Sequence, residues 1–454
     1  MSERQQVLKN FEEQKDYLDQ KISYGIENYR KGDAKITLKD GDGSAADGAK
    51  IKITQKTHHF KFGANLFLLD ELESDEKNNT YKKYFADVFN MATLPFYWND
   101  LEPVCGKPRF DKNSPKVYRR PALDLCVEFC RKNGIEPREH CLNYDLFRPQ
   151  WLYGASVDVI KQKLEERIKI LAERYRDDIP CWEVTNETLC ILPEGKASAF
   201  YYEPDFVEWS FETAQKYLGD NQLAINESPW WVYDKAFLYN RSPYYMLIDR
   251  AIKNGARIDA IGMQFHMYFT REEEVQKVTK YFYNPRHHYE LMDTYAGFGK
   301  PLQLTEITIP AYSNDPEDEE LQAQILEKLY SIWFSHPATE QIIYWNLVDG
   351  YAFVPNPDPE KIRRSQGDMT LGENYYYGGL VRFDMTPKPA YYAIKNLINN
   401  VWRTRGELCT DDGGTATMRG FYGRYEVEIE RRGKRTITEL ELLPGGKNEF
   451  EIEV

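Results

Sequence analysis

The chain has 454 residues and a mass of 53.4 kDa, which suits a large barrel with an appendage better than one minimal domain. Its net charge of −13 argues against nucleic acid and anionic membranes as partners, because both attract clustered Lys and Arg. No stretch of the sequence approaches the roughly 20 apolar residues that a membrane-spanning helix needs.

The amino terminus and the cysteines indicate the cellular compartment in which the protein is expected. Met1-Ser-Glu-Arg-Gln-Gln has no apolar signal core, which predicts a cytoplasmic protein; had a signal been removed, the protein would be secreted. The seven Cys residues are odd in number and scattered, as expected of reduced thiols. Cys126 and Cys130 lie one helical turn apart, but no second pair with ligand spacing completes a site. We therefore expect no metal and no cofactor.

The chain begins with a predicted amphipathic helix and a predicted hairpin. Apolar residues recur at near-helical spacing through residues 1–33, which predicts a helix with one apolar face. Residues 34–57 alternate on either side of a Gly- and Asp-rich turn, which predicts a β-hairpin. Because a lone hairpin is marginal in water, we expect it to pack with strands at the end of the chain.

Residues 58–403 repeat a strand, a loop and a helix. Strands are predicted at 60–66, 88–94, 136–142, 180–186, 222–226, 258–265, 301–306 and 341–347. Helices are predicted at 78–86, 118–133, 156–176, 204–218, 243–254, 286–298, 317–335 and 388–401. Eight strands that alternate with helices are typical of a (β/α)8 TIM barrel, an α/β fold. The segment 353–380 then follows the eighth strand as a long loop on the active face.

The last segment, 404–454, returns to the alternation of strands. Tyr425-Glu-Val-Glu-Ile-Glu, Thr436-Ile-Thr-Glu-Leu-Glu-Leu and Asn448-Glu-Phe-Glu-Ile-Glu-Val each read as a short strand. We expect them to form one small β module with residues 34–57. The alternative is a separate C-terminal domain.

Two glutamates stand where barrel strands end. Glu187 follows the apolar run 179–184, and Glu306 follows the similar run 301–305. The C-terminal ends of barrel strands converge at one mouth, and the fourth and seventh strands lie across it. Two carboxylates placed there are what a retaining glycosidase needs, since one protonates the leaving oxygen and the other attacks the anomeric carbon. For either Glu alone, a solvated carboxylate in a loop is the alternative.

The residues around this pair resemble glycoside hydrolase family 10, the retaining endo-β-1,4-xylanases, over about residues 60–400. Trp182-Glu-Val-Thr-Asn-Glu187 is similar to the family's Trp-Asp-Val-Val-Asn-Glu, which ends in the acid/base. Leu304-Thr-Glu306-Ile-Thr-Ile is similar to its Ile-Thr-Glu-Leu-Asp-Ile, which carries the nucleophile. The resemblance implies that Glu187 is the acid/base and Glu306 the nucleophile.

Further motifs extend the resemblance to substrate-binding residues. Ile261-Gly-Met-Gln264-Phe-His266 is similar to the family's Ile-Gly-x-Gln-Ser-His, and Tyr344-Trp345 resembles the segment whose Trp floors the −1 subsite. Glu139-His140-Cys-Leu-Asn-Tyr144-Asp145 is similar to Gly-His-Thr-Leu-Val-Trp-His. The expected substrate-binding residues are Asn186, His140, Gln264, His266, Trp345, Trp98, Tyr144 and Asp145.

Physical arguments support several of these assignments. The amide of Asn186 can hydrogen-bond a sugar 2-hydroxyl, a contact that strengthens in an oxocarbenium-like transition state. A hydrogen bond from His266 to Glu306 would set the ionisation and orientation of that carboxylate. Gln264 and His266 lie on one strand face because they are two residues apart. Core packing is the alternative for His266 and for Trp345.

The second strand departs from the family pattern. Where the family has Pro-Glu-Asn-Glu-Met-Lys-Trp, this chain has Ala92-Thr-Leu-Pro-Phe-Tyr-Trp98, so the polar trio that binds the −2 and −1 sugars is replaced by apolar and aromatic residues. On the third strand, Tyr144 and Asp145 replace the family's Trp and second His. Hydrogen bonds of this kind discriminate strongly between substrates, so we expect altered specificity.

The sequence thus predicts a retaining glycoside hydrolase that cleaves β-1,4-linked glycans, with xylan or xylo-oligosaccharides as the default substrate. One alternative keeps the mechanism and changes the substrate to a glucan, a mannan or a substituted xylan. Another is a non-catalytic carbohydrate-binding barrel, although both glutamates are present. The expected partner is an oligosaccharide or polysaccharide, and the sequence leaves the oligomeric state open.

Overall fold

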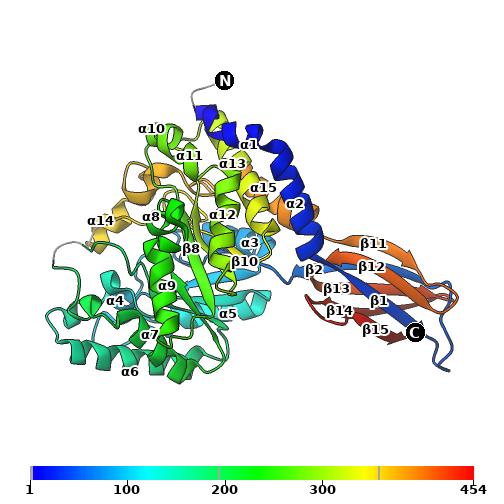
Figure 1. Cartoon of the computed structure of the whole chain (residues 1–454). Coiled ribbons are helices and arrows are strands. Elements are labelled where there is room, and N and C mark those ends of the chain that lie inside the picture. Colours follow the sequence, from blue (N-terminus) through cyan, green and yellow to red (C-terminus); the bar gives the residue numbers. More distant parts are fainter. Residues whose placement is uncertain (1–3, 193–194, 356–357) are drawn as a thin grey trace.

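A computed structural model describes residues 4–192, 195–355 and 358–454 and shows a barrel with a β-sandwich attached (Figure 1). Eight parallel strands close in the order β10-β3-β4-β5-β6-β7-β8-β9. They are β3 (Lys61–Asn65), β4 (Met91–Pro95), β5 (Glu136–His140), β6 (Cys181–Asn186), β7 (Gln222–Asn226), β8 (Ala260–His266), β9 (Leu302–Thr308) and β10 (Thr339–Tyr344). Each overlaps a predicted strand, and the predicted (β/α)8 fold is confirmed.

Helices alternate with these strands and cover the barrel. The long ones are α3 (Asp75–Val88), α5 (Leu123–Asn133), α6 (Val157–Tyr175), α7 (Phe206–Leu218), α9 (Pro243–Lys253), α12 (Pro285–Ala296), α13 (Pro316–Ser335) and α15 (Pro389–Asn396). Short helices are α4 (Trp98–Leu101), α8 (Pro229–Val232), α10 (Arg271–Glu273), α11 (Thr279–Tyr281) and α14 (Pro359–Arg364). Within the described ranges, no helix combines the length and apolarity needed to cross a membrane.

One helix boundary differs from the prediction in a way that shapes the site. The helix predicted at 118–133 begins only at Leu123, and Arg119 adopts a left-handed backbone with φ of 59°. Pro121 explains part of the difference, because the residue before a proline is driven out of the helical region. The segment before Leu123 therefore belongs to the long loop after β4.

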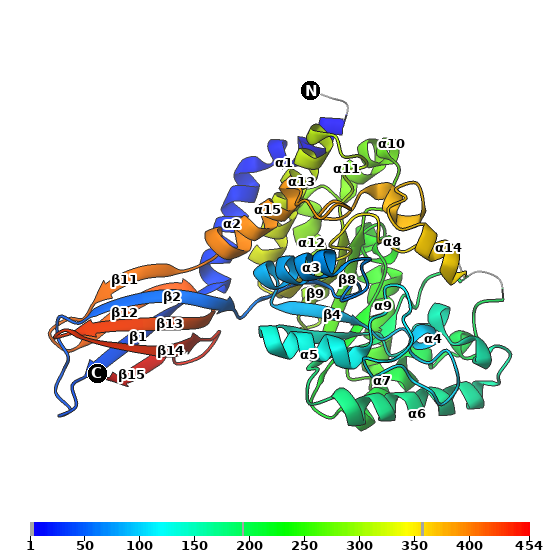
Figure 2. The same ribbon diagram turned by 180° about the vertical axis from the view of Figure 1, so that it is seen from behind.

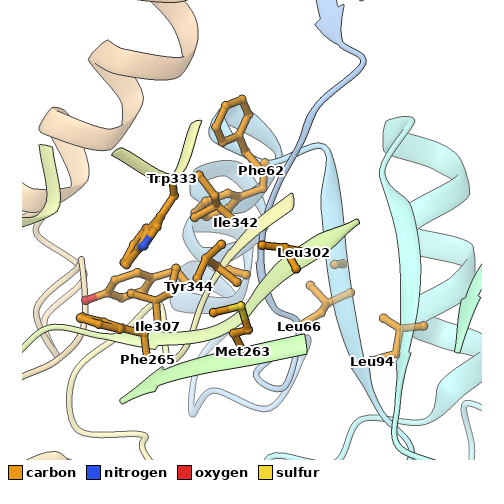
Figure 3. Packing of buried hydrophobic residues seen from close by; sticks show 14 of the residues in the cluster. Phe62, Leu66, Leu94, Met263, Phe265, Leu302, Ile307, Trp333, Ile342 and Tyr344 are labelled. Carbon is orange, nitrogen blue, oxygen red and sulfur yellow. The ribbon is translucent and has the colours of Figure 1, made fainter. Parts of the chain in front are cut away.

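The barrel core is built from residues that are buried on both faces of the sheet (Figure 3). Phe62, Leu94 and Ile342 on the strands are fully buried, and Trp333 of α13 packs edge-on against Phe265 of β8 with ring centroids 5.1 Å apart. Parallel strands covered by helices read as continuous apolar runs for this reason.

The N-terminal segment, predicted as one helix over 1–33, is interrupted instead. A 3-10 turn at Arg4–Leu8 leads into α1 (Lys9–Glu13) and α2 (Lys15–Tyr29), and the break falls at Gln14, whose φ and ψ are −106° and 17°. Figures 1 and 2 show α2 along α13. Gly25 permits this approach, because a Cβ there would lie 2.1 Å from the carbonyl oxygen of Ser335.

A buried ion-pair network fixes the start of this segment to the barrel. The Arg4 Nε lies 2.9 Å from Glu274 Oε2, and its Nη1 lies 2.8 Å from Asp318 Oδ1. The same guanidinium donates to the carbonyl oxygens of Pro310 and Ala311, which closely follow β9. The N-terminal segment therefore braces the loop that follows the strand of Glu306.

The hairpin predicted at 34–57 is wrong. β1 (Lys31–Lys39) lies between β12 and β15 in one sheet, whereas β2 (Lys50–His58) lies between β11 and β13 in another. The C-terminal strands are β11 (Arg405–Cys409), β12 (Thr415–Phe421), β13 (Gly423–Arg431), β14 (Lys434–Leu442) and β15 (Glu449–Glu453). Each of the two N-terminal strands has one apolar face, and the two faces bury each other across a sandwich instead of pairing edge to edge.

The fold class predicted for this module, a β unit made from both ends of the chain, is confirmed. Its core contains Ile36, Leu38, Ile51 and Val427 from the two sheets. Since β2 ends at His58 and β3 begins at Lys61, the sandwich joins the N-terminal ends of the barrel strands. It lies beside the barrel in Figures 1 and 2, on the side opposite the strand ends that carry Glu187 and Glu306.

The buried Arg4 network yields a stability prediction. Arg4→Met leaves Glu274 buried without its cation, so we expect the free energy of unfolding to fall by about 3–5 kcal/mol. Lys253→Met is the matched control, because its ion pair with Asp249 is solvent-exposed and such pairs contribute roughly 0–1 kcal/mol. Urea unfolding measures both variants.

Adding Glu274→Gln to Arg4→Met should restore part of the loss, because the uncompensated carboxylate is then gone. Equal losses in Arg4→Met and Lys253→Met would contradict a stabilising role for the buried pair.

Candidate active site

Glu187 and Glu306 open into one cavity of about 340 Å³ at the C-terminal ends of the barrel strands. Glu187 directly follows β6 with a left-handed φ of 50°, and Glu306 lies near the end of β9. Gln264, on β8 next to β9 in the barrel, lines the same cavity. The two predicted catalytic residues are therefore brought together.

The Glu306 carboxylate is buried, with one partner on each oxygen. Asn226 Nδ2 donates to Oε1 at 2.8 Å, and His266 Nε2 lies 3.2 Å from Oε2. Burial raises the pKa of Glu306 to about 8, and the nearby carboxylates of Glu183 and Glu187 add to this effect. The cationic form of His140 acts in the opposite direction.

The Glu187 carboxylate accepts hydrogen bonds from two other predicted residues. Tyr144 Oη donates to Oε2 at 2.5 Å, and Gln264 Nε2 donates to Oε1 at 3.1 Å. Gln264 Nε2 also lies 3.1 Å from Asn186 Oδ1, which places the Asn186 amide between the two sides of the site. Tyr144, Gln264 and Asn186 thus surround Glu187.

Beneath the pair lies a fully buried charge cluster centred on Glu183. Arg138 Nη2 is 2.6 Å from one Glu183 oxygen, and His140 Nδ1 is 2.9 Å from the other. Burial alone would lower the pKa of His140, but the carboxylates of Glu183 and Glu306 raise it above its usual value. His140 Nε2 lies 2.9 Å from Tyr97 Oη. The two carboxylates thus favour the protonated form of His140, whose Nδ1 lies 4.0 Å from Glu306 Oε1.

The pKa of His266 is shifted in the opposite direction to that of His140. Burial lowers its pKa to about 4, so its ring is neutral at pH 7. Its Nδ1 lies 3.0 Å from the Thr308 hydroxyl, a neutral group at the position where the family motif carries Asp. Nδ1 has no carboxylate partner, and the charges of Glu373 and Glu187, which favour the imidazolium form, do not offset the effect of burial. The neutral ring and the raised pKa of Glu306 are therefore mutually consistent.

Aromatic rings form the floor of the cavity. Trp345 packs edge-on against Phe67 at 5.0 Å between centroids and against His140 at 5.4 Å. Tyr97 and Phe147 continue this surface at a centroid distance of 4.5 Å. Trp345 lines the cavity, and its stacking beneath a sugar ring stays a prediction.

Three predicted substrate-binding residues, Trp98, Asp145 and the fully buried His140, lie outside the cavity lining. Trp98 begins α4, donates from Nε1 to Glu102 at 3.0 Å and packs edge-on against Trp151. Its neighbour Tyr97 lines the cavity instead, because the chain turns directly after β4. Asp145 is buried and accepts from the Ser198 hydroxyl at 2.6 Å, so it ties two loops together.

Several site residues went unrecognised in the sequence. The clearest available signal was Asn226-Glu227, which repeats Asn186-Glu187 at the end of the next strand. Glu227 is buried, which raises its pKa to about 8, and it accepts from the backbone N–H of Leu189 at 2.9 Å. It therefore holds the loop that follows Glu187. The other unrecognised residues are Arg138, Glu183, Arg119, Arg120, Asn346, Tyr268 and Glu373.

One group of side chains has the composition of a metal site. His140, Cys141 and Glu183 place potential ligand atoms within 4.8 Å of one another. Both oxygens of Glu183 already accept hydrogen bonds, one of them from the Arg138 guanidinium. Burial raises the pKa of the Cys141 thiol, which disfavours the thiolate that a metal requires. The donor set therefore fits a cation poorly.

Comparisons with known proteins find relatives over most of the chain. The sequence model of Glycosyl hydrolase family 10 matches residues 60–397. The Anti-sigma-I factor RsgI6 of Acetivibrio thermocellus is 22% identical over 413 residues, which cover 90% of this chain and 46% of that protein. Endo-1,4-beta-xylanase A of Caldicellulosiruptor saccharolyticus is 25% identical over 314 residues, which cover 61% of this chain and 86% of the xylanase. The chain thus spans under half of the first relative and most of the second.

Solved structures share the barrel. Xylanase 10B from Thermotoga petrophila, in complex with xylobiose, superposes with a TM-score of 0.56 at 21% identity and covers 76% of this chain and 95% of its own. The closed barrel and its two strand-end carboxylates define a protein of the glycoside hydrolase class. The family match runs through most of the chain, so the protein belongs to Glycosyl hydrolase family 10. The resemblance inferred from the sequence is confirmed.

The Thr308 contact yields a prediction about His266. Thr308→Asp places a carboxylate beside Nδ1, so we expect the His266 pKa to rise from about 4 and the Glu306 pKa to fall in response. NMR titration of histidine-labelled protein measures the ring directly. Thr308→Asn is the uncharged control and should leave the His266 pKa low. Equal shifts in both variants would show that charge at position 308 does not govern the ring.

Proposed function

We propose that the protein is a retaining glycoside hydrolase that cleaves β-1,4-linked xylan or xylo-oligosaccharides. The observation that carries the proposal is the pair Glu187 and Glu306, which line one cavity in different surroundings. Glu306 sits between Asn226 and His266, which orient it, while Glu187 contacts the hydroxyl of Tyr144. A nucleophile and a separate proton donor are the two parts that this reaction needs.

The proposed reaction has two steps. Ionised Glu306 attacks the anomeric carbon while protonated Glu187 gives its proton to the glycosidic oxygen, so the bond breaks and an ester joins the glycosyl unit to Glu306. Ionised Glu187 then takes a proton from water, and the resulting attack on the anomeric carbon releases Glu306. Two displacements at one carbon return the original configuration.

The neighbours of the pair have defined tasks in this scheme. Asn226 Nδ2 and His266 hold the two oxygens of Glu306, which limits the orientations available for attack. The Asn186 amide, held by Gln264, lies where it can bind the hydroxyl next to the reacting carbon. Trp345 supplies an apolar face below the sugar. Xylan is favoured as the substrate because several relatives are named as xylanases.

Chemical rescue tests the nucleophile. Glu306→Ala should abolish hydrolysis of an aryl β-xyloside, and azide should restore turnover with an α-glycosyl azide as product, because the small anion attacks from the vacated side. Glu407→Ala, on an exposed strand of the sandwich, is the control and should match the unmodified protein. Hydrolysis by Glu306→Ala without added azide would refute the assignment. If the unmodified protein binds xylo-oligosaccharides but releases no product, the carbohydrate-binding alternative is favoured.

The pH dependence of kcat/KM tests the environment of Glu306. The attacking form is the carboxylate, and its population falls as the pH drops below the Glu306 pKa of about 8. We therefore expect kcat/KM to decline on the acid side at a pH well above 4.5, where an ordinary Glu would titrate. Thr308→Asp should move this decline to lower pH. A decline centred between pH 4 and 5 in the unmodified protein would contradict the raised pKa.

A further inference from the structure

One end of the catalytic cavity contains two arginines that the family motifs do not account for. Arg119 and Arg120 belong to the loop between β4 and α5 and line the same cavity as Glu187 and Glu306. Phe353 and Glu373, from the long loop after β10, line it as well. This end, which we call the arginine end, lies beside the aromatic floor described above.

Arg119 carries a buried charge that no nearby carboxylate balances. Its side chain is only 2% exposed, and its Nη1 donates to two neutral acceptors, Asn346 Oδ1 at 2.5 Å and the Tyr351 carbonyl at 2.7 Å. Among the described residues, no carboxylate lies within 4.0 Å of the guanidinium, and its buried Nε has no hydrogen-bond partner. A buried cation without a counter-charge is costly, so an anionic group of a ligand would be stabilised beside Arg119.

The backbone supports the same interpretation. Arg119 has a φ of 59°, a backbone conformation that L residues rarely adopt and that persists only where the surroundings impose it. Pro121 keeps the segment out of α5. The guanidinium also lies over the Phe67 ring, 5.5 Å from its centroid. The fold thus holds Arg119 in a strained position against the cavity.

The other charges at this end are already engaged. Arg120 Nε pairs with Asp100 at 2.8 Å, and the Arg120 guanidinium stacks 3.9 Å from the centroid of Tyr97. Glu373 accepts from Asn346 Nδ2 at 3.0 Å, so the Asn346 amide stands between Glu373 and Arg119. Of the described residues at this end, Arg119 is therefore the cation available to a ligand.

We propose that the arginine end binds the carboxylate of a uronic acid unit carried by the glycan, with Arg119 as its counter-charge. The inference deepens the proposed function and rests on it. The planar guanidinium matches a carboxylate in a bidentate geometry and gives charge-assisted hydrogen bonds. Phe147 and Phe353, which line the cavity with ring centroids 6.2 Å apart, offer aromatic surface for the apolar side of the sugar ring.

A neutral sugar satisfies the site less well. Its hydroxyls can accept hydrogen bonds from Arg119, but they leave the buried positive charge without compensation. Among the described residues, the acids that line the cavity are Glu187, Glu306 and Glu373, which would repel a uronate placed beside them. A carboxylate therefore binds more favourably at Arg119 than beside these acids. Discrimination between acidic and neutral glycans follows from this one pairing.

The test compares two xylo-oligosaccharides of equal length, one of which carries a glucuronic acid branch. The readout is the ratio of kcat/KM for the acidic substrate to that for the neutral one, so any general loss of activity cancels. We expect the unmodified protein to favour the acidic substrate and Arg119→Met to lower the ratio by about tenfold or more. Added salt should lower the ratio in the unmodified protein only, because it screens the ion pair.

Glu373→Gln is the matched variant, and the expected change in the kcat/KM ratio has the opposite sign. Removal of this negative charge from the same end should raise the ratio, whereas a structural role for the Arg119–Asn346–Glu373 contacts would lower or preserve it. Thermal unfolding checks that each variant is folded. Should Arg119→Met fail to fold, the direction of the change in Glu373→Gln decides the question.

Failure of the inference differs from failure of the proposed function. A ratio near one in the unmodified protein, with clear hydrolysis of the neutral substrate, overturns the uronate assignment and leaves the hydrolase proposal intact. Hydrolysis of neither substrate contradicts the hydrolase proposal instead. In that event, calorimetry with the same two oligosaccharides still decides whether the cavity prefers the acidic one.

Discussion

The ion cluster of Glu183, Arg138 and His140, sealed inside the barrel, is the interaction on which the site depends. Removal of one partner from such a cluster costs about 3–5 kcal/mol, because a bare charge remains in the interior. Asn226 links the cluster to the nucleophile, since its amide lies near oxygens of both Glu183 and Glu306. The contacts of the buried cluster thus hold the Glu306 carboxylate in position. The residues that line the cavity above the cluster can change without disturbing these contacts.

The sequence was sufficient to predict the barrel and the placement of Glu187 and Glu306 at one mouth of it. Strand periodicity is local, and a Glu at each of two strand ends follows directly once the strands are counted. The predictions that failed concern the pairing of strands that are distant in the sequence and the direction in which a side chain points. β1 and β2 have the alternation of a hairpin, but partners from the other end of the chain separate them into two sheets. Trp98 adjoins a cavity residue, yet it points away after one turn of the backbone.

Arg119 illustrates a subtler limit of sequence reasoning. A helical period continues through residues 118–133, and only the actual path of the chain shows that the first of these residues form a loop at the cavity. The loss of the family's polar trio after the second strand was visible in the sequence. The presence of Arg119 and Glu373 in the cavity was not, because they come from two loops that are distant in the chain.

The β-sandwich combines strands from both ends of the chain, which has a consequence for its biosynthesis. β1 and β2 leave the ribosome early, yet β1 pairs with strands that begin at Thr415 and Glu449. During translation, the edges of both strands remain unpaired while the whole barrel is made between them. Exposed strand edges invite association with other chains, so nascent β1 and β2 are candidates for chaperone protection. Both strands carry alternating Lys residues, such as Lys35 and Lys52. Their charge discourages aggregation while the strand edges are still unpaired during translation.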